Sequence, residues 1–142
     1  MKNNHDILSS ILKTAQMGQT GIRAVLGYAG DSNLKQALKD QLHEYDAIEE
    51  EALQLASQHR LNVAELSPVA KSMSKMYTHC NLKFGNVDSK IAAMMIQGNT
   101  RGMIKGLKNL HHAKSVDKSI EALSRKLLDC ETANVKQMQG FV

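Results

Sequence analysis

Tryptophan is absent from this chain of 142 residues, proline occurs once, at Pro68, and aromatic residues make up only 4%. Sheets are rich in aromatic and β-branched residues, so this scarcity argues against a β fold. Proline interrupts helices, and a single proline leaves long stretches free to be helical. Alanine, leucine, lysine, glutamine and methionine, which favour helices, are frequent. The composition therefore predicts an all-α protein.

The sequence also lacks the signals of export and membrane insertion. No run of about 18 apolar residues occurs, although a spanning helix would need one. The first residues, MKNNHDILSSIL, lack the apolar stretch and the cleavage site of a signal peptide. Two cysteines, Cys80 and Cys130, are too few for a disulfide framework and fit a reducing compartment. We therefore expect a cytoplasmic protein with no membrane partner.

The length and the apolar fraction of 42% suit a single globular domain, residues 1–142. Apolar residues recur at helical spacing in four long segments and in one shorter one. These segments are His5–Ala29, Asn33–Arg60, Asp88–His112 and Ser115–Gln139, with the shorter one at Pro68–Phe84. Gly30, Asp31 and Ser32 are expected to end the first helix and cap the second, so that the two form an antiparallel hairpin.

The segment 61–87 decides between two topologies. The first two helices are each about 40 Å long at 1.5 Å per residue, and a loop of about seven residues cannot recross that length. A helix continuous from Pro68 would give an up-down-up-down bundle. A break at Gly85 would let residues 61–87 run back as a partly helical crossover, and we favour this ferritin-like antiparallel four-helix bundle.

The net charge of +4 is unevenly distributed along the chain. Acidic residues outnumber Lys and Arg before residue 71, with a concentrated run between Glu44 and Glu51, and basic residues dominate from Lys71 onward. A basic face could bind nucleic acid. Packing of two oppositely charged hairpins, or ordinary solvated helix faces, is the favoured explanation of the asymmetry, and no recognition motif accompanies it. We weight nucleic acid low as a partner.

The segment Asp88–His112 has two contrasting sides on a helical wheel. The side expected to face the core carries Ala93, Ile96, Thr100, Met103, Ile104 and Leu107, with Gln97 at its edge. The back carries Ile91, Met94 and Met95, followed by Gly98, Gly102 and Gly106. Glycine inside a helix costs about 0.5–1 kcal/mol relative to alanine, so three at four-residue spacing need a reason.

A glycine face allows another backbone to approach closely. One interpretation is tight packing within the chain, against another helix. The other is a homodimer interface formed by Met94, Met95, Gly98, Gly102 and Gly106. The sequence does not separate these two interpretations.

Four segments of the chain resemble a known family. They are GQTGIRAVL (18–26), LHEYDAIEEEA (42–52), FGNVDSKIAAMMIQGNTRGMIKGLKNL (84–110) and LLDCETANVKQM (127–138). Together they resemble the bacterial ferritin-like four-helix-bundle proteins of unknown function. The resemblance covers nearly the whole chain, and it implies a fold rather than an activity.

The resemblance also implies where di-iron ligands would lie, because ferritin-like sites use a Glu and a Glu-x-x-His from each hairpin. The matching positions are Gln19, Glu44 with Ala47, Gln97, and Glu131 with Asn134. Both histidines and two of the four carboxylates are therefore replaced. Neutral amides are poor ligands for a pair of dications. We expect no resident cofactor, with a weakly bound metal ion as the alternative.

The residues at these positions could form a polar layer in the core. The layer would contain Gln19, Glu44, Gln97, Thr100, Glu131 and Asn134. Buried polar groups need hydrogen-bond partners, and a layer of them could fix the register of the helices. The alternative is a weak site for one metal ion or a small ligand.

A second candidate site is rich in sulfur. Met73, Met76, His79 and Cys80 fall within two helical turns, and soft ligands suit a metal such as Cu(I). Methionine on a helix is more often core filler. No Ser-His-Asp arrangement or glycine-rich phosphate loop is recognisable.

Three functions are compatible with these observations. The favoured one is a non-enzymatic bundle that acts by association, as a homodimer or with a protein partner. The alternatives are a metal-binding or storage protein of ferritin-like descent and a basic nucleic-acid-associated protein. Catalysis is the class that the sequence favours least, because no activated group can be named.

Overall fold

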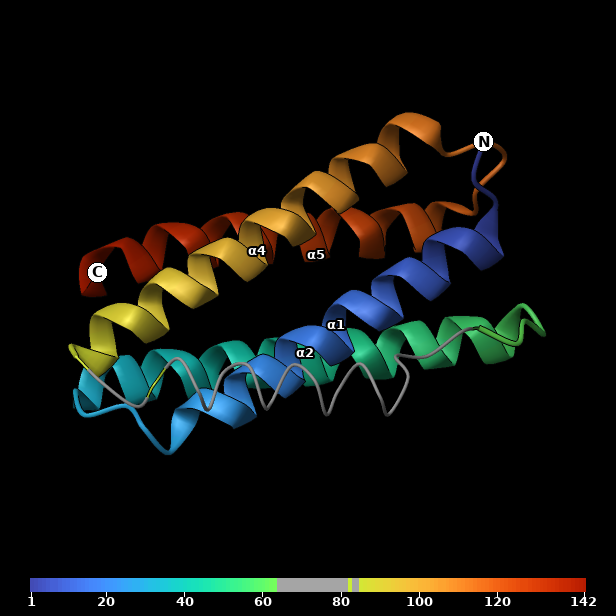
Figure 1. Ribbon diagram of the computed structural model, residues 1–142. Coiled ribbons are helices and arrows are strands. Elements are labelled where there is room, and N and C mark those ends of the chain that lie inside the picture. The colour runs from blue at the N-terminus through green and yellow to red at the C-terminus, as the bar shows by residue number, and fades with distance from the viewer. Residues whose placement is uncertain (64–81, 83–84) are drawn as a thin grey trace.

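The computed structural model describes residues 1–63, 82 and 85–142, and it contains four long helices (Figure 1). They are α1 (Asn4–Leu26), α2 (Ser32–Gln58), α4 (Val87–His112) and α5 (Lys118–Met138), followed by a short 3-10 helix, η1 (Gln139–Phe141). The all-α prediction is confirmed. The predicted helix Pro68–Phe84 and the sulfur-rich cluster Met73, Met76, His79 and Cys80 lie outside the described residues.

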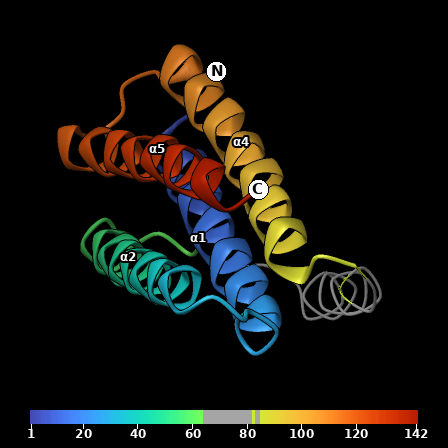
Figure 2. The ribbon, with the colours of Figure 1, turned by 90° about the vertical axis from the view of Figure 1, so that its left-hand side faces the viewer.

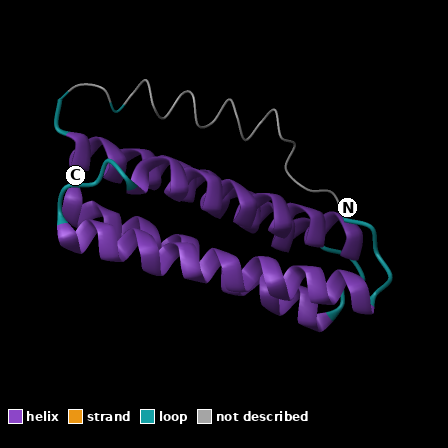
Figure 3. Ribbon diagram, turned by 90° about the horizontal axis from the view of Figure 1, so that it is seen from below, coloured by secondary structure: helices purple, strands orange, loops and turns teal. Residues whose placement is uncertain are grey.

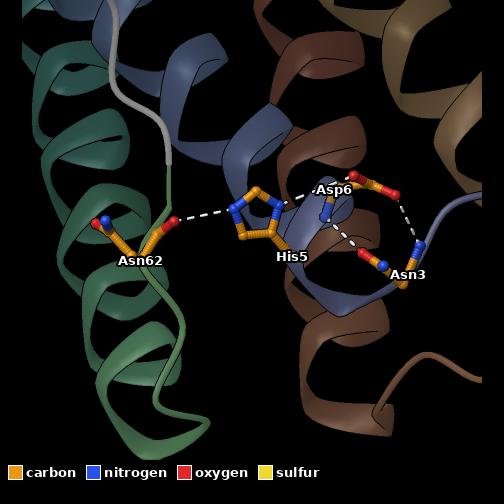
Figure 4. Close-up of polar contacts among 4 residues, drawn as sticks. All are labelled: Asn3, His5, Asp6 and Asn62. Atoms are coloured by element: carbon orange, nitrogen blue, oxygen red, sulfur yellow. Dashed lines mark hydrogen bonds and ion pairs between the residues drawn. The ribbon is translucent and has the colours of Figure 1, made fainter.

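Short polar side chains cap these helices at their first turns. Asn3 and Asp6 form a reciprocal capping box at α1, with the Asp6 N–H donating to Asn3 Oδ1 at 3.0 Å (Figure 4). Asp31 Oδ1 accepts from the N–H groups of Asn33 and Leu34 at the start of α2, as predicted for this turn. The last long helix begins at Lys118 rather than Ser115, because Ser115 has a φ of 53°, outside the helical region.

The four helices form a closed ring of neighbours around one core. α1 packs against α2 and α4 packs against α5, each pair joined by a short turn, and α2·α5 and α1·α4 contacts connect the two hairpins. The end-on view shows this ring, with α1 between α2 and α4 (Figure 2). The view from below shows helices running the length of the molecule, linked by loops at its two ends (Figure 3).

The start of α4 lies against the α1–α2 turn. Asp88 accepts hydrogen bonds from the backbone N–H of Gly30 at 2.8 Å and of Asp31 at 2.9 Å. Since α2 also begins at this turn, α2 and α4 run parallel (Figure 1). The residues after α2 lie at the opposite end, where His5 Nε2 is 2.9 Å from the Asn62 carbonyl oxygen (Figure 4). The helix directions are therefore those of the crossover alternative, not of an up-down-up-down bundle.

The first residues of the chain are tied to the loop between α4 and α5. The Lys2 N–H donates to the His112 carbonyl at 2.8 Å, and the Lys114 N–H donates to the Lys2 carbonyl at 2.9 Å. Lys2 Nζ also donates to Asn109 Oδ1 at 2.7 Å, and Asn109 Nδ2 donates to the buried Ser10 Oγ at 2.8 Å. These bonds hold the start of α1 beside the end of α4, so these two helices run antiparallel.

The inward face of α4 differs from the predicted one. Ile91, Met95 and Asn99 are buried, whereas Ile104 and Leu107 are 50% and 47% exposed. Ile96 of the predicted core side still packs against the core, but the later part of that side faces outward, and Gly102 and Gly106 of the back face α5. The reason is close packing, because a face that lacks side chains lets a neighbouring helix approach. None of the helices in the described parts of the chain is long and apolar enough to cross a membrane.

We predict that Asp88→Ala lowers the free energy of unfolding by about 1–3 kcal/mol, because two backbone N–H groups lose a charged acceptor. Urea unfolding followed by circular dichroism measures the change. Asp129→Ala on the exposed face of α5 is the matched control and should change stability by less than about 0.5 kcal/mol. Equal effects of the two substitutions would contradict the anchoring role of Asp88.

Candidate functional site

A pocket of about 530 Å³ lies between α1 and α4. Helix α1 supplies one wall and α4 the opposite one, while α2 and α5 each contribute one side chain, Tyr45 and Glu131. The pocket exists partly because its walls carry small residues. Gly21 and Gly98 both line it, and a Cβ added to either would meet nothing within 4 Å.

Three polar side chains from three different helices meet at the pocket. The Tyr45 hydroxyl is 2.7 Å from Asn99 Oδ1 and 3.1 Å from Glu131 Oε2. Their exposed fractions are only 3%, 2% and 1% for Tyr45, Asn99 and Glu131. We call these three residues the polar floor. A buried cluster of this kind links α2, α4 and α5 through hydrogen bonds that water cannot replace.

The protonation state of Glu131 follows from this geometry. Burial raises the pKa of Glu131 to about 8, although the hydrogen bond from Tyr45 opposes the rise. A phenol has a single proton, and Asn99 Oδ1 can only accept, so Tyr45 donates to Asn99. The Tyr45 hydroxyl also lies within donating distance of Glu131 Oε2, and the raised pKa keeps the Glu131 carboxyl largely protonated at pH 7. The polar floor is therefore an uncharged chain of hydrogen bonds.

Two glycines make room for the polar floor. A Cβ on Gly18 would lie 2.4–2.7 Å from atoms of the Tyr45 ring. A Cβ on Gly102 would lie 2.5 Å from Glu131 Oε1 and 2.7 Å from its Cδ. Side chains at these two positions would overlap atoms of the floor, so both helices need glycine there.

The polar floor leaves hydrogen-bonding capacity unused. Asn99 Nδ2 is buried without a hydrogen-bond partner. An unsatisfied buried donor costs about 1–3 kcal/mol, so such groups usually have an explanation. Asn99 lines the pocket, and a bound molecule with an acceptor atom would supply its missing partner.

The charged side chains that line the pocket are cations. They are Lys13 on α1 and Arg101 and Lys105 on α4, and none of them forms an ion pair within the described parts of the chain. The pKa of Lys105 is lowered by partial burial and then by repulsion from Lys13 and Lys2. The described acid that lines the pocket is Glu131, which is neutral at pH 7. The pocket therefore favours anions over cations.

The predicted polar layer is only partly found. Glu131 and Asn134 are buried, as expected. Gln19 is also buried, but its Nε2 donates to Asp46 Oδ1 at 2.9 Å and Glu49 Oε1 at 3.2 Å, along the α1–α2 seam and away from the polar floor.

The other three predicted positions do not belong to the core. Glu44 is exposed at the edge of α2, and its pKa is raised by partial burial. Gln97 is exposed on α4, as is Thr100, although Gln97 borders the pocket. Placing Glu44 and Gln97 in the core was wrong because neighbouring helix positions point about 100° apart. Tyr45 and Asn99 occupy the inward directions instead.

Asn99 is the residue of the polar floor that the sequence pattern missed. It lies four residues after Met95 and three before Gly102, in register with the buried side of α4. The glycines of α4 could have indicated the inward position of Asn99, because a helix face that carries glycines is one that packs closely against a neighbour. No role was predicted for Tyr45.

The residues present do not fit a di-iron centre. The carboxylate buried at the polar floor, Glu131, has an amide and a phenol as its hydrogen-bonding neighbours. Across residues 1–63, 82 and 85–142, no three His, Cys, Asp or Glu side chains lie close enough together to hold a metal ion. Two irons need several oxygen and nitrogen ligands, which this set of donors does not provide.

The glycines predicted at a homodimer interface have different surroundings. A Cβ on Gly102 would meet Glu131 and one on Gly106 would meet Leu128, so α5 covers both positions. This favours the interpretation of tight packing within the chain for these two. Gly98, Met94 and Met95 line the pocket instead. The predicted homodimer remains a prediction.

Comparison with known proteins adds nothing to this geometry. The chain matches no protein-family model, no curated protein and no solved structure. The resemblance to ferritin-like proteins therefore remains an expectation, and the functional argument rests on the pocket and its floor.

We predict opposite effects for two glycine substitutions on α1. Gly18→Ala should destabilise the protein by about 1–3 kcal/mol, because the new methyl group displaces the rigid ring of Tyr45. Gly21→Ala meets open space and should stabilise by up to about 1 kcal/mol through helix propensity. Urea unfolding of both variants gives the comparison. A stabilising Gly18→Ala would show that the ring has room to move.

We predict that stability falls as pH rises from 4.5 to about 8. In this window folded Glu131 keeps a proton that the unfolded chain has lost, since its pKa rises from 4.5 to about 8 on folding. The loss is about 1.4 kcal/mol for each pH unit at most. Tyr45, Cys130 and Glu44 also face this region, and the pKa of each is raised.

Glu131→Gln isolates the contribution of Glu131. The variant should lose most of the fall in stability between pH 5 and 8 and should exceed the wild type at pH 9, as measured by urea unfolding at each pH. An unchanged slope in the variant would assign the pH dependence to another group.

Proposed function

We propose that this protein is a non-enzymatic binding protein that holds a small organic molecule in the pocket between α1 and α4. The observation that carries the proposal is the unpaired Asn99 Nδ2, buried beside a pocket of about 530 Å³. Ligand pockets typically combine mostly apolar walls with a few convergent polar groups. Here Met17, Val25 and Met95 supply apolar wall and the polar floor supplies those groups.

Binding is favoured over catalysis because neither the Tyr45 phenol nor the Cys130 thiol is activated as a base or a nucleophile. The pKa of Tyr45 is raised by burial and by the neighbouring Glu131, so its phenol is a poor base at neutral pH. The pKa of the Cys130 thiol is raised to about 11 by burial and by Glu44, which keeps it protonated and weakly nucleophilic. Groups of this kind recognise a ligand by hydrogen bonding and leave it unchanged.

The proposal includes a ferritin-like origin for the bundle. Parallel α2 and α4, each antiparallel to its hairpin partner, support such a lineage, since ferritin-like folds have one long crossover connection. In this chain the core position of an ancestral metal site would hold Tyr45, Asn99 and Glu131. Loss of metal ligands and gain of a pocket are then parts of one change of function.

We predict that Nile red, a neutral dye whose fluorescence rises in apolar surroundings, binds the wild type, and that Gly98→Leu abolishes the signal. The leucine side chain would enter open space in the pocket. Replacing a helical glycine should also stabilise the fold by up to about 1 kcal/mol, so lost binding would not reflect unfolding. A fluorescence titration and urea unfolding measure the two effects.

Gly27→Leu is the matched control. Gly27 also has nothing within 4 Å of an added Cβ, has a φ of −69° that any residue can adopt, and does not line the pocket. This variant should bind Nile red as the wild type does. Equal binding by the wild type and by Gly98→Leu would refute the proposal, because the dye would then sit elsewhere.

A further inference from the structure

The pocket has different chemistry at its two ends, and this follows from the antiparallel packing of its walls. Lys13 lies in the first half of α1 and Lys105 in the second half of α4, so the two come to the same end. Their repulsion, which helps to lower the pKa of Lys105, is consistent with this proximity. At the opposite end, Val25 of α1 lies beside the start of α4 with Met94 and Met95.

The cationic end has no counter-ion in the described structure. Lys13, Arg101 and Lys105 form no ion pair within residues 1–63, 82 and 85–142, and Lys2 adds a further positive charge nearby. Lys2 Nζ donates to the neutral Asn109 Oδ1, and Lys2 forms no ion pair with another described residue. Converging cations repel one another, and a bound anion would relieve that repulsion.

At the apolar end, none of the described residues that line the pocket is charged. Val25 is 1% exposed and Met95 is 8% exposed, while Met94 packs against the same core. Methionine adapts its shape to irregular apolar ligands. Twelve residues separate Lys13 from Val25, which corresponds to roughly 18 Å along the helix axis. The pocket is therefore long enough for an extended chain that is charged at one end only.

We infer that the ligand is a linear amphipathic monoanion, such as a medium-chain carboxylate, and this inference rests on the proposed function. Its anionic head lies at Lys13, Arg101 and Lys105, and its apolar chain extends along Gly21 and Gly98 toward Val25 and Met94. Halfway along, the uncharged polar floor offers Asn99 Nδ2 to a polar substituent on the chain.

Isothermal titration calorimetry with three probes of equal chain length tests the inference. The probes are decanoate, decanol and decylammonium, each below its aggregation concentration. Decanoate should bind about tenfold more tightly than decanol, which corresponds to about 1.4 kcal/mol. Decylammonium should bind most weakly. The advantage of decanoate over decanol should shrink as salt is added, because the attraction is electrostatic.

Two double variants separate the pocket cations from the overall charge. Lys13→Gln/Lys105→Gln should bring decanoate close to the affinity of decanol and leave decanol unchanged. Lys108→Gln/Lys118→Gln removes the same net charge at exposed positions outside the pocket and should leave the decanoate advantage intact. Neither variant should unfold, since Lys13 and Lys105 repel each other and Lys108 and Lys118 are exposed surface residues.

The outcomes distinguish this inference from the proposed function. If decanol or decylammonium binds as tightly as decanoate, the anionic specificity is wrong while the pocket remains a binding site. If decanoate binds Gly98→Leu as tightly as the wild type, the amphiphile sits elsewhere and the inference is wrong. If none of the three probes binds, the inference also fails, and the Nile red titration decides separately whether the pocket accepts other molecules.

Discussion

The Tyr45 hydroxyl joins three of the four long helices that the structure describes, and its position depends on two glycines that leave space for it. Gly18 accommodates the Tyr45 ring and Gly102 accommodates Glu131, each at a distance that a Cβ would occupy. The resulting bonds to Asn99 and Glu131 cross between the two hairpins. Buried hydrogen bonds are directional, so they select one relative placement of the hairpins where apolar contacts alone would tolerate several.

The pocket is a consequence of the same glycines. Glycine at Gly18 and Gly102 lets the helices approach the polar floor, while Gly21 and Gly98, one turn away, leave empty space instead of contact. Helix interiors with several glycines lose stability, by about 1 kcal/mol for each. A bundle selected for stability alone would fill this space with larger side chains. The retained space and the unpaired Asn99 Nδ2 together connect the architecture of the core with ligand binding.

Much of the fold was predictable because it depends on local rules. The scarcity of proline and aromatic residues, the helical spacing of apolar residues and the cap at Asp31 predicted four helices with ends close to those observed. The ends that shifted did so for local reasons as well. The start of α5 shifted because Ser115 has a positive φ. Serine does not require this angle, so nothing in the sequence indicated it.

The site was less predictable because it depends on rotation about each helix axis. The segment Val87–His112 has apolar residues on both sides, so hydrophobicity alone did not decide which side faces inward. The prediction placed Gln97 in the core where the structure has Asn99, and Glu44 where it has Tyr45. These offsets of one or two positions matter because successive side chains on a helix point about 100° apart. Burial of Glu131 and Asn134 was predicted correctly because α5 has a single apolar face.

By itself, the sequence determined the helical class and the positions of the four long helices that the structure describes. These features depend on propensity, spacing and residue identity, which are properties of single segments. Only the tertiary structure decided that α2 and α4 run parallel, that the glycine face of α4 points inward, and that Lys13 and Lys105 share one end of a pocket. These features depend on which surfaces meet, and that is settled by packing and hydrogen bonds between residues far apart in the chain.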